Sequence, residues 1–173
     1  MQLEQAKQQF IQTWGNFGSQ WGINRSMAQV HALLIVSDSP LCTEDIMEKL
    51  SISRGNANMN IRELANWNLI YKESIAGDRK EYFRAEKDMW EVAKRIVKER
   101  KRRELEPLQQ HLAELKKVEQ SYESISFVAT IENIERLVGR LDSLSGTLMK
   151  ADEHVFFGKI VNLRIAMIPL MMR

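Results

Sequence analysis

Apolar residues recur at helical spacing along most of the chain, which predicts a mainly α-helical protein. Residues 2–18 are polar except for one stripe at that spacing, so an amphipathic helix is expected there. The stripe consists of Leu3, Ala6, Phe10, Trp14 and Phe17. Residues 25–36 are apolar around more of their circumference, which predicts a second and more deeply buried helix.

Two short helices joined by a tight link are predicted between residues 43 and 68. Thr43 is well placed to cap the first helix, which should end near Leu50, because the acidic residues that follow it suit the first turn. Ser53 is expected to cap the second helix, which should run to about residue 68. The inner side of the second helix should hold the apolar residues Ala57, Ile61, Leu64 and Ala65.

Residues 69–74 and 80–85 resemble two strands joined by a turn. Gly77 can take a positive φ in this turn at little cost. Helix, link, helix and hairpin in this order are the elements of a winged helix-turn-helix domain. We therefore expect a mainly α protein with a small β-hairpin wing.

Helical segments follow the hairpin. Asp88 with Glu91 resembles a capping box, and helix-forming residues continue to about residue 117. Pro107 interrupts them, so the helix should bend there or a new helix should begin with proline in its first turn.

Two apolar segments near the C-terminus are expected to pack against other protein surfaces. A helix is predicted at about residues 124–149, and its apolar stripe is close to a heptad seam. Residues 155–172 are very apolar but contain Lys159 and Arg164, which favours a buried helix at a subunit interface over a membrane span.

Composition and charge narrow the class of protein only slightly. Of the 173 residues, 44% are hydrophobic and 28% charged, as in an ordinary globular protein. The single cysteine, Cys42, excludes an intrachain disulfide and is expected to be a small buried residue. Because no apolar segment follows a basic start, no secretory leader is expected and the cytoplasm is the expected location.

The net charge of +2 is too small to indicate nucleic-acid binding by itself. Residues 86–104 hold eight Lys or Arg and five Asp or Glu, and the basic run from Lys98 to Arg103 stands out. This run is either a solvated helix face or a surface for phosphates or a partner helix.

The second predicted helix carries side chains that suit the major groove of DNA. Asparagine can pair bidentately with adenine and arginine with guanine, while a capped helix N-terminus suits a phosphate. The residues of this kind are Ser53, Arg54, Asn56, Asn58 and Arg62. Three asparagines at alternate positions lower helix propensity, and such exposed choices suggest a function. At the hairpin tip, Arg79 would lie near the minor groove and Lys80 near phosphate, with Asp78 ordering the turn.

These residues resemble those of one family. The most specific match is the string Ser-Arg-Gly-Asn-Ala-Asn-Met-Asn-Ile-Arg-Glu-Leu from Ser53 to Leu64. The further matches are Gln20-Trp21-Gly22 with Arg25, Pro40-Leu41, Trp67 and Gly77-Asp78-Arg79-Lys80-Glu81-Tyr82-Phe83. Over roughly residues 10–110 the chain is similar to the GbsR-like branch of the MarR-type winged helix-turn-helix transcriptional regulators.

The resemblance implies a homodimer that pairs through its N-terminal and C-terminal helices. It also implies base contacts from Arg54, Asn56, Asn58 and Arg62 and a wing contact from Arg79. Some members of the family sense choline-like quaternary ammonium compounds, and a cation gains about 0.5–2 kcal/mol over an aromatic face. A small-molecule effector would then be held by aromatic residues such as Trp14, Trp21, Trp67 and Trp90, although aromatics at helical spacing are more often core.

Three parts of the chain are expected on these grounds. Residues 1–24 form an N-terminal helix within the dimerisation region, residues 25–87 the DNA-binding domain and residues 88–173 a C-terminal helical dimerisation region. The expected function is sequence-specific binding of double-stranded DNA by a homodimer at an inverted repeat, in the regulation of transcription. The alternative is a winged-helix protein-interaction adaptor without sequence-specific DNA binding.

Enzymatic activity and a cofactor are not expected. The sequence has no phosphate loop, dinucleotide fingerprint, His-Glu-x-x-His motif or serine elbow. His31, His111 and His154 are too scattered to suggest a metal site.

Overall fold

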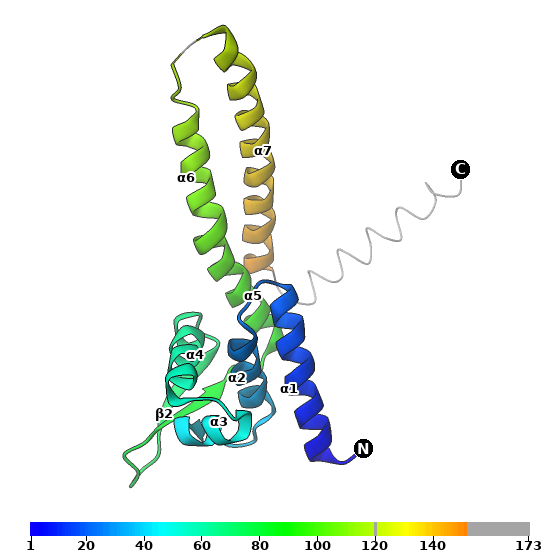
Figure 1. Ribbon diagram of the computed structural model, residues 1–173, viewed down its shortest axis with the longest axis vertical. Helices are drawn as coiled ribbons and strands as arrows, with labels where there is room; N and C mark the ends of the chain where they lie inside the picture. Colours follow the sequence, from blue (N-terminus) through cyan, green and yellow to red (C-terminus); the bar gives the residue numbers. More distant parts are fainter. Residues whose placement is uncertain (120, 152–173) are drawn as a thin grey trace, which may run out of the picture. The chain divides into compact units, whose positions relative to one another are not determined.

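The computed structural model describes residues 1–119 and 121–151, and the predicted helix at 155–172 lies outside them (Figure 1). The described chain is mainly helical with one small antiparallel sheet, as predicted. It divides into two units, Met1–Arg95 and the residues from Ile96 onward. No helix in the described ranges is long and apolar enough to cross a membrane.

Helix α1 (Leu3–Gln20) packs along α2 (Arg25–Val36) through small residues. Its buried positions are Ile11, Gly15 and Gly18, and a Cβ atom at Gly18 would lie only 2.6 Å from the Cβ atom of Ala28. The predicted amphipathic helix is present, but its apolar stripe is not the buried face, since Leu3 and Phe17 are exposed and Ala6, Phe10 and Trp14 are half-buried. The physical reason is that the glycines let the two helices approach closely on a neighbouring face of α1.

The two short helices are α3 (Thr43–Leu50) and α4 (Arg54–Asn66). The N-cap of α3 is Cys42 and not Thr43 as predicted, and the side chain of Asp45 accepts the backbone N–H of Cys42 at 2.9 Å. Helix α3 ends at Ser51, which is left-handed with φ 53°. Ser53 caps α4 as predicted, accepting the backbone N–H of Asn56 at 3.3 Å.

The buried side of α4 differs from the prediction in two residues. Ala57, Ile61 and Leu64 are buried as expected, but Ala65 is exposed and Asn60 is buried. At 100° per residue the buried sector extends from Asn60 to Ile61, and Ala65 lies about 40° beyond it. The Asn60 amide is compatible with burial because it donates to the backbone carbonyl of Asn56 at 2.9 Å.

The sheet contains β1 (Leu41–Cys42), β2 (Ile70–Ser74) and β3 (Glu81–Ala85) in the antiparallel order β1-β3-β2. The hairpin register pairs Ile70 with Ala85 and Ser74 with Glu81. Strands β2 and β3 were predicted. Strand β1 was not, because a two-residue strand has no periodicity of its own and exists only through pairing with β3.

The core of this unit is built around α2, which packs against α1, α3, α4 and β3. Its largest fully buried apolar side chains come from five different helices and are Ile11, Val30, Leu34, Ile46, Leu64 and Val92. This packing fixes the inner side of α4 and leaves its opposite side to solvent.

In the C-terminal part of the chain, α5 (Met89–Arg100), a π-helical stretch η1 (Lys101–Leu105) and α6 (Glu106–Leu115) follow without a break. Asp88 begins α5 by accepting the backbone N–H groups of Trp90 and Glu91. Pro107 stands in the first turn of α6, as one of the two predicted arrangements requires. The wider π-turn directly precedes it, with the N–H of Glu106 bonded to the carbonyl of Lys101.

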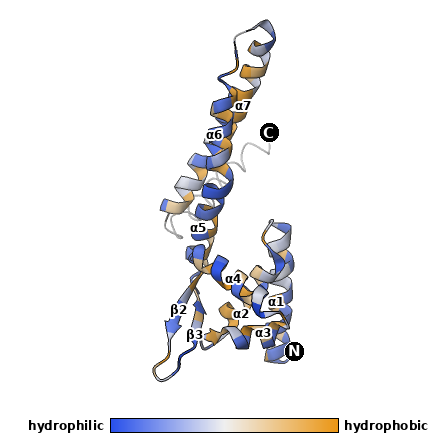
Figure 2. Cartoon of the chain, turned by 60° about the vertical axis from the view of Figure 1, so that its left-hand side comes forward, coloured by the Kyte–Doolittle hydropathy of each residue, from blue (hydrophilic) through white to orange (hydrophobic). Residues whose placement is uncertain are grey.

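Helix α7 (Tyr122–Lys150) lies against α6. The shared core contains Leu112, Ile131 and Val138, with Leu105 packed on it. Most of the apolar stripe of α7 is not covered by this contact, and Figure 2 shows hydrophobic residues recurring along this helix. Four of its exposed members, Ile134, Leu137, Leu141 and Leu144, form what we call the α7 apolar face.

Candidate nucleic-acid interface

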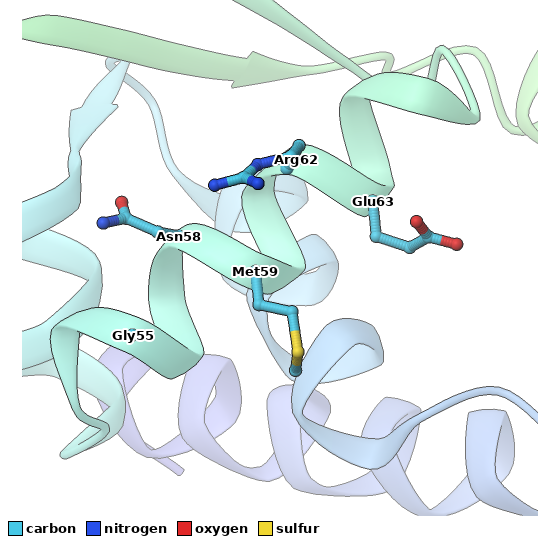
Figure 3. A pocket seen from close by; sticks show the side chains of 5 residues that line it. All are labelled: Gly55, Asn58, Met59, Arg62 and Glu63. Carbon is cyan, nitrogen blue, oxygen red and sulfur yellow. The ribbon is translucent and has the colours of Figure 1, made fainter.

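The solvent side of α4 forms a shallow hollow of about 360 Å³, which we call the α4 hollow (Figure 3). Its lining residues are Gly55, Asn58, Met59, Arg62 and Glu63. Figure 3 shows the side chains of Asn58 and Arg62 extending from one side of the helix, and those of Met59 and Glu63 from other sides. The hollow therefore combines an amide, a guanidinium, a carboxylate and an apolar side chain on one exposed helix.

Two of the residues predicted to contact DNA lie in this hollow. Arg62 is exposed, so its guanidinium can reach an external partner. Asn58 is also exposed, and the Thr43 hydroxyl donates to its side-chain oxygen at 3.5 Å. Both residues present groups that can bond to base edges in the major groove.

Two other predicted residues have partners within the protein. The guanidinium of Arg54 contacts the carboxylate of Glu44 at 2.8 Å, with both side chains partly exposed. Asn56 is half-buried, and its side-chain oxygen accepts a hydrogen bond from Asn60. The expectation of three exposed asparagines was therefore wrong, because Asn60 is only 2% exposed and its buried amide is hydrogen-bonded to Asn56.

The position of Glu44 at the start of α3 affects the pKa of its carboxyl group. Hydrogen bonds from its own backbone N–H, from Cys42 and from Arg54 lower the pKa of this carboxyl group. Glu44 is therefore an anion at neutral pH, and it orients the Arg54 guanidinium across the link between α3 and α4.

The first turn of α4 offers backbone donors. Ser53 is exposed and its hydroxyl oxygen accepts one of the free N–H groups of that turn. The N-terminal amides of a helix and the positive end of its dipole suit a phosphate group.

The tip of the hairpin is held by Asp78. Its carboxylate accepts the backbone N–H of Lys80 at 2.9 Å and the hydroxyl of Tyr82 at 2.7 Å. These two hydrogen bonds, the one from the Lys80 backbone first, lower the pKa of Asp78. Gly77 has φ 85° as the turn requires, and Arg79 and Lys80 are exposed beside it. The predicted role of Asp78 in ordering the turn is confirmed.

The base of the hairpin is joined to both neighbouring helices by a group we call the Arg95 cluster, consisting of Asn68, Tyr71, Glu86 and Arg95. One guanidinium nitrogen of Arg95 donates to the backbone carbonyl of Asn68 at 2.5 Å and to the Tyr71 hydroxyl at 2.6 Å. The other lies 3.0 Å from Glu86, which also accepts the Tyr71 hydroxyl. Sequence reasoning missed this cluster, because Arg95 looks like one more cation in a charged helix.

The tryptophans suggested for an effector lie on separate elements. Trp14 is on α1 and Trp21 directly follows that helix, and rings follow one another from Phe10 through Trp14 and Phe17 to Trp21. Trp67 ends α4 and donates to Glu63 at 3.0 Å, and Trp90 is in the first turn of α5. The aromatic residues that the structure brings together are thus those of α1, and an effector site stays a prediction.

The basic run is largely paired with acids. Arg100 contacts Glu104, Arg102 and Arg103 contact Glu99, and Lys101 lies 2.8 Å from Asp142 of α7. Much of its charge is therefore balanced within the protein. In the described ranges, no group of three or more His, Cys, Asp or Glu side chains is arranged to hold a metal ion.

No protein-family model matches the sequence, and no curated protein matches it. A crystal structure described as that of a transcriptional regulator aligns over 83% of this chain and 95% of its own, with 16% identity and a TM-score of 0.65. A variant of S. aureus MepR bound to an oligodeoxyribonucleotide aligns over 80% and 92%, with 16% identity and a TM-score of 0.40. A second MepR variant aligns over 97% and 92%, with 15% identity and a TM-score of 0.36. The chain therefore shares the winged-helix fold of the first of these structures.

Proposed function

We propose that this protein is a sequence-specific DNA-binding transcriptional regulator. The observation that carries the proposal is the exposure of Asn58 and Arg62 on the second helix of a helix-turn-helix, directly followed by a hairpin with Arg79 and Lys80 at its tip. The major groove is about 12 Å wide and admits one helix, whose outward side chains then meet base edges. Helix α4 would occupy the major groove and the hairpin the adjoining minor groove.

The residues of this interface divide into two roles. Asn58 and Arg62 read bases, since amide and guanidinium groups match adenine and guanine edges. Ser53, the first-turn amides of α4 and Lys80 bind phosphates, which fixes the position of the helix without reading sequence. Arg54 can contact DNA only if its guanidinium leaves Glu44, and Asn56 only if its side chain leaves Asn60.

A homodimer is part of the proposal. The α7 apolar face leaves four large apolar side chains in water, and such a face is typical of an interface with another protein surface. A second copy would cover it with the same face, as two-fold symmetry requires. The two copies of α4 would then bind half-sites about one helical turn, roughly 34 Å, apart in an inverted repeat.

Two further observations agree with this function. The structure whose fold the chain shares is described as a transcriptional regulator. The string from Ser53 to Leu64 resembles the GbsR-like branch of MarR-type regulators. A quaternary ammonium effector bound near the α1 aromatic rings would act by shifting the population of dimers with the half-site spacing that DNA requires.

The test is selection from a random duplex library by the purified protein, followed by titration of the selected DNA at several salt concentrations. We expect enrichment of an inverted repeat and an affinity that falls steeply with salt, because phosphate contacts release counterions. Enrichment of no sequence, with binding insensitive to salt, would contradict the proposal and leave a protein-interaction adaptor as the better explanation.

A further inference from the structure

Met59 is the apolar member of the α4 hollow, and it is 56% exposed. The fold does not need it there, because the core contacts of α4 are made by Ala57, Ile61 and Leu64 on the other side. A single exposed apolar residue is common on protein surfaces, so the exposure of Met59 alone does not point to a partner, and its surroundings decide the question.

Gly55 lies one turn before Met59 on the same side of α4. A Cβ atom at Gly55 would meet no atom within 4 Å, and its φ is not in the left-handed region. Neither packing nor backbone conformation therefore requires glycine here, although glycine costs an exposed helix about 1 kcal/mol relative to alanine. A missing side chain at this position leaves Met59 open to a large partner that approaches along the helix.

Two neighbours of Met59 carry groups that can read bases, and Glu63 also lines the hollow. Asn58 precedes it, and Arg62 follows on the next turn, also lining the hollow. The major-groove edges of the four base pairs present hydrogen-bonding groups and only one apolar group, the C5-methyl of thymine. An apolar side chain beside an amide and a guanidinium thus matches a thymine that stands next to the purines those two residues recognise.

We propose that Met59 packs against the C5-methyl group of a thymine in each half-site and so specifies T at that position. This inference rests on the proposed DNA-binding function and assigns to one exposed residue a specificity that the polar residues of α4 do not supply. Burying one methyl-sized group contributes a free energy equivalent to about fourfold in affinity.

The experiment replaces thymine by deoxyuridine, which keeps every hydrogen-bonding group and removes only the methyl. In the duplex recovered by random-site selection, each thymine of one half-site is replaced in turn and the affinity of the full-length protein is measured. We expect one position at which the replacement weakens binding about fourfold.

The variant Met59→Ala should bind the thymine and deoxyuridine duplexes at that position equally well. Met59→Leu, which keeps an apolar side chain, should retain most of the difference. Met89→Ala is the matched control, because Met89 is 42% exposed at the start of α5 and lies outside the α4 hollow; it should behave as the wild type does. Thermal unfolding should show that Met59→Ala is folded, since the side chain is not part of the core.

The outcomes separate this inference from the function on which it rests. Selection that enriches no sequence would overturn both. An enriched sequence with no position sensitive to deoxyuridine, or with a sensitivity that persists in Met59→Ala, would overturn the role of Met59 alone. If Met59→Ala loses association with another protein while its DNA preference is unchanged, the exposed methionine belongs to a protein interface and the inference is wrong.

Discussion

Acidification from pH 7 to pH 5 should destabilise the folded protein through one residue, His31. This histidine lies on α2 and is only 3% exposed, with its ring 6.4 Å from that of Trp14. Its Nε2 atom has no hydrogen-bond partner among the described residues. Burial lowers the pKa of His31 from 6.5 to about 4. The imidazole is therefore neutral in the folded protein and takes up a proton when the chain unfolds.

The sign and size follow from proton linkage. Between pH 6.5 and pH 4 the unfolded chain binds more protons at this residue than the folded chain, so stability decreases as the pH falls through this window. A pH of 5 is about 1.5 units below the pKa of histidine in the unfolded chain, which corresponds to about 2 kcal/mol of lost stability. At pH 7 the loss from this residue is very small. The carboxyl groups with lowered pKa values, such as Glu86, lose their contribution only at more acidic pH.

Urea unfolding at pH 7 and pH 5, at one protein concentration, measures this loss. We expect the free energy of unfolding of the wild type to fall by about 2 kcal/mol, and that of His31→Leu to change much less, because leucine has no proton to bind. An equal loss of stability in His31→Leu would refute the reasoning.

Three further predictions concern packing, DNA contacts and assembly. Gly18→Ala should lower the free energy of unfolding in urea by about 1–3 kcal/mol, because the added methyl would overlap Ala28. Gly55→Ala should raise it by up to about 1 kcal/mol, because nothing lies near that position. Equal effects of the two substitutions would contradict the close packing of α1. Arg62→Ala should cost about 1–3 kcal/mol of binding to the selected duplex and relax preference at one base, while Arg79→Ala should mainly reduce the salt slope by about 1; titrations that match the wild type would exclude both contacts. Leu141→Glu on the α7 apolar face should give a folded monomer in sedimentation, since Leu141 is 46% exposed within one chain; a persistent dimer would show that another surface pairs the copies.

Local features of the interface could be predicted from the sequence. Ser53 caps α4 because serine before a helical segment bonds to free N–H groups wherever the helix lies in the fold. Gly77 and Asp78 order the hairpin tip through bonds that span only a few residues. Such features depend on neighbours in the sequence, so their residue types indicate them directly.

Features that depend on distant contacts could not be predicted. The buried face of α1 is decided by its glycines meeting α2, which the spacing of its apolar residues does not indicate. Asn60 looks like an exposed polar residue until its hydrogen bond to the Asn56 carbonyl is seen. The pairing of Arg54 with Glu44 needs the angle between α3 and α4, which no periodicity records.

The Arg95 cluster has a consequence for local opening of the molecule. A two-stranded hairpin alone is only marginally stable in water. Here one guanidinium bonds to Asn68 in the link after α4, to Tyr71 of strand β2 and to Glu86 just before α5, so the hairpin cannot separate without losing all three contacts. The wing, the last turn of α4 and the first turns of α5 should therefore open as one cooperative unit, with backbone amides that exchange hydrogen at a common free energy.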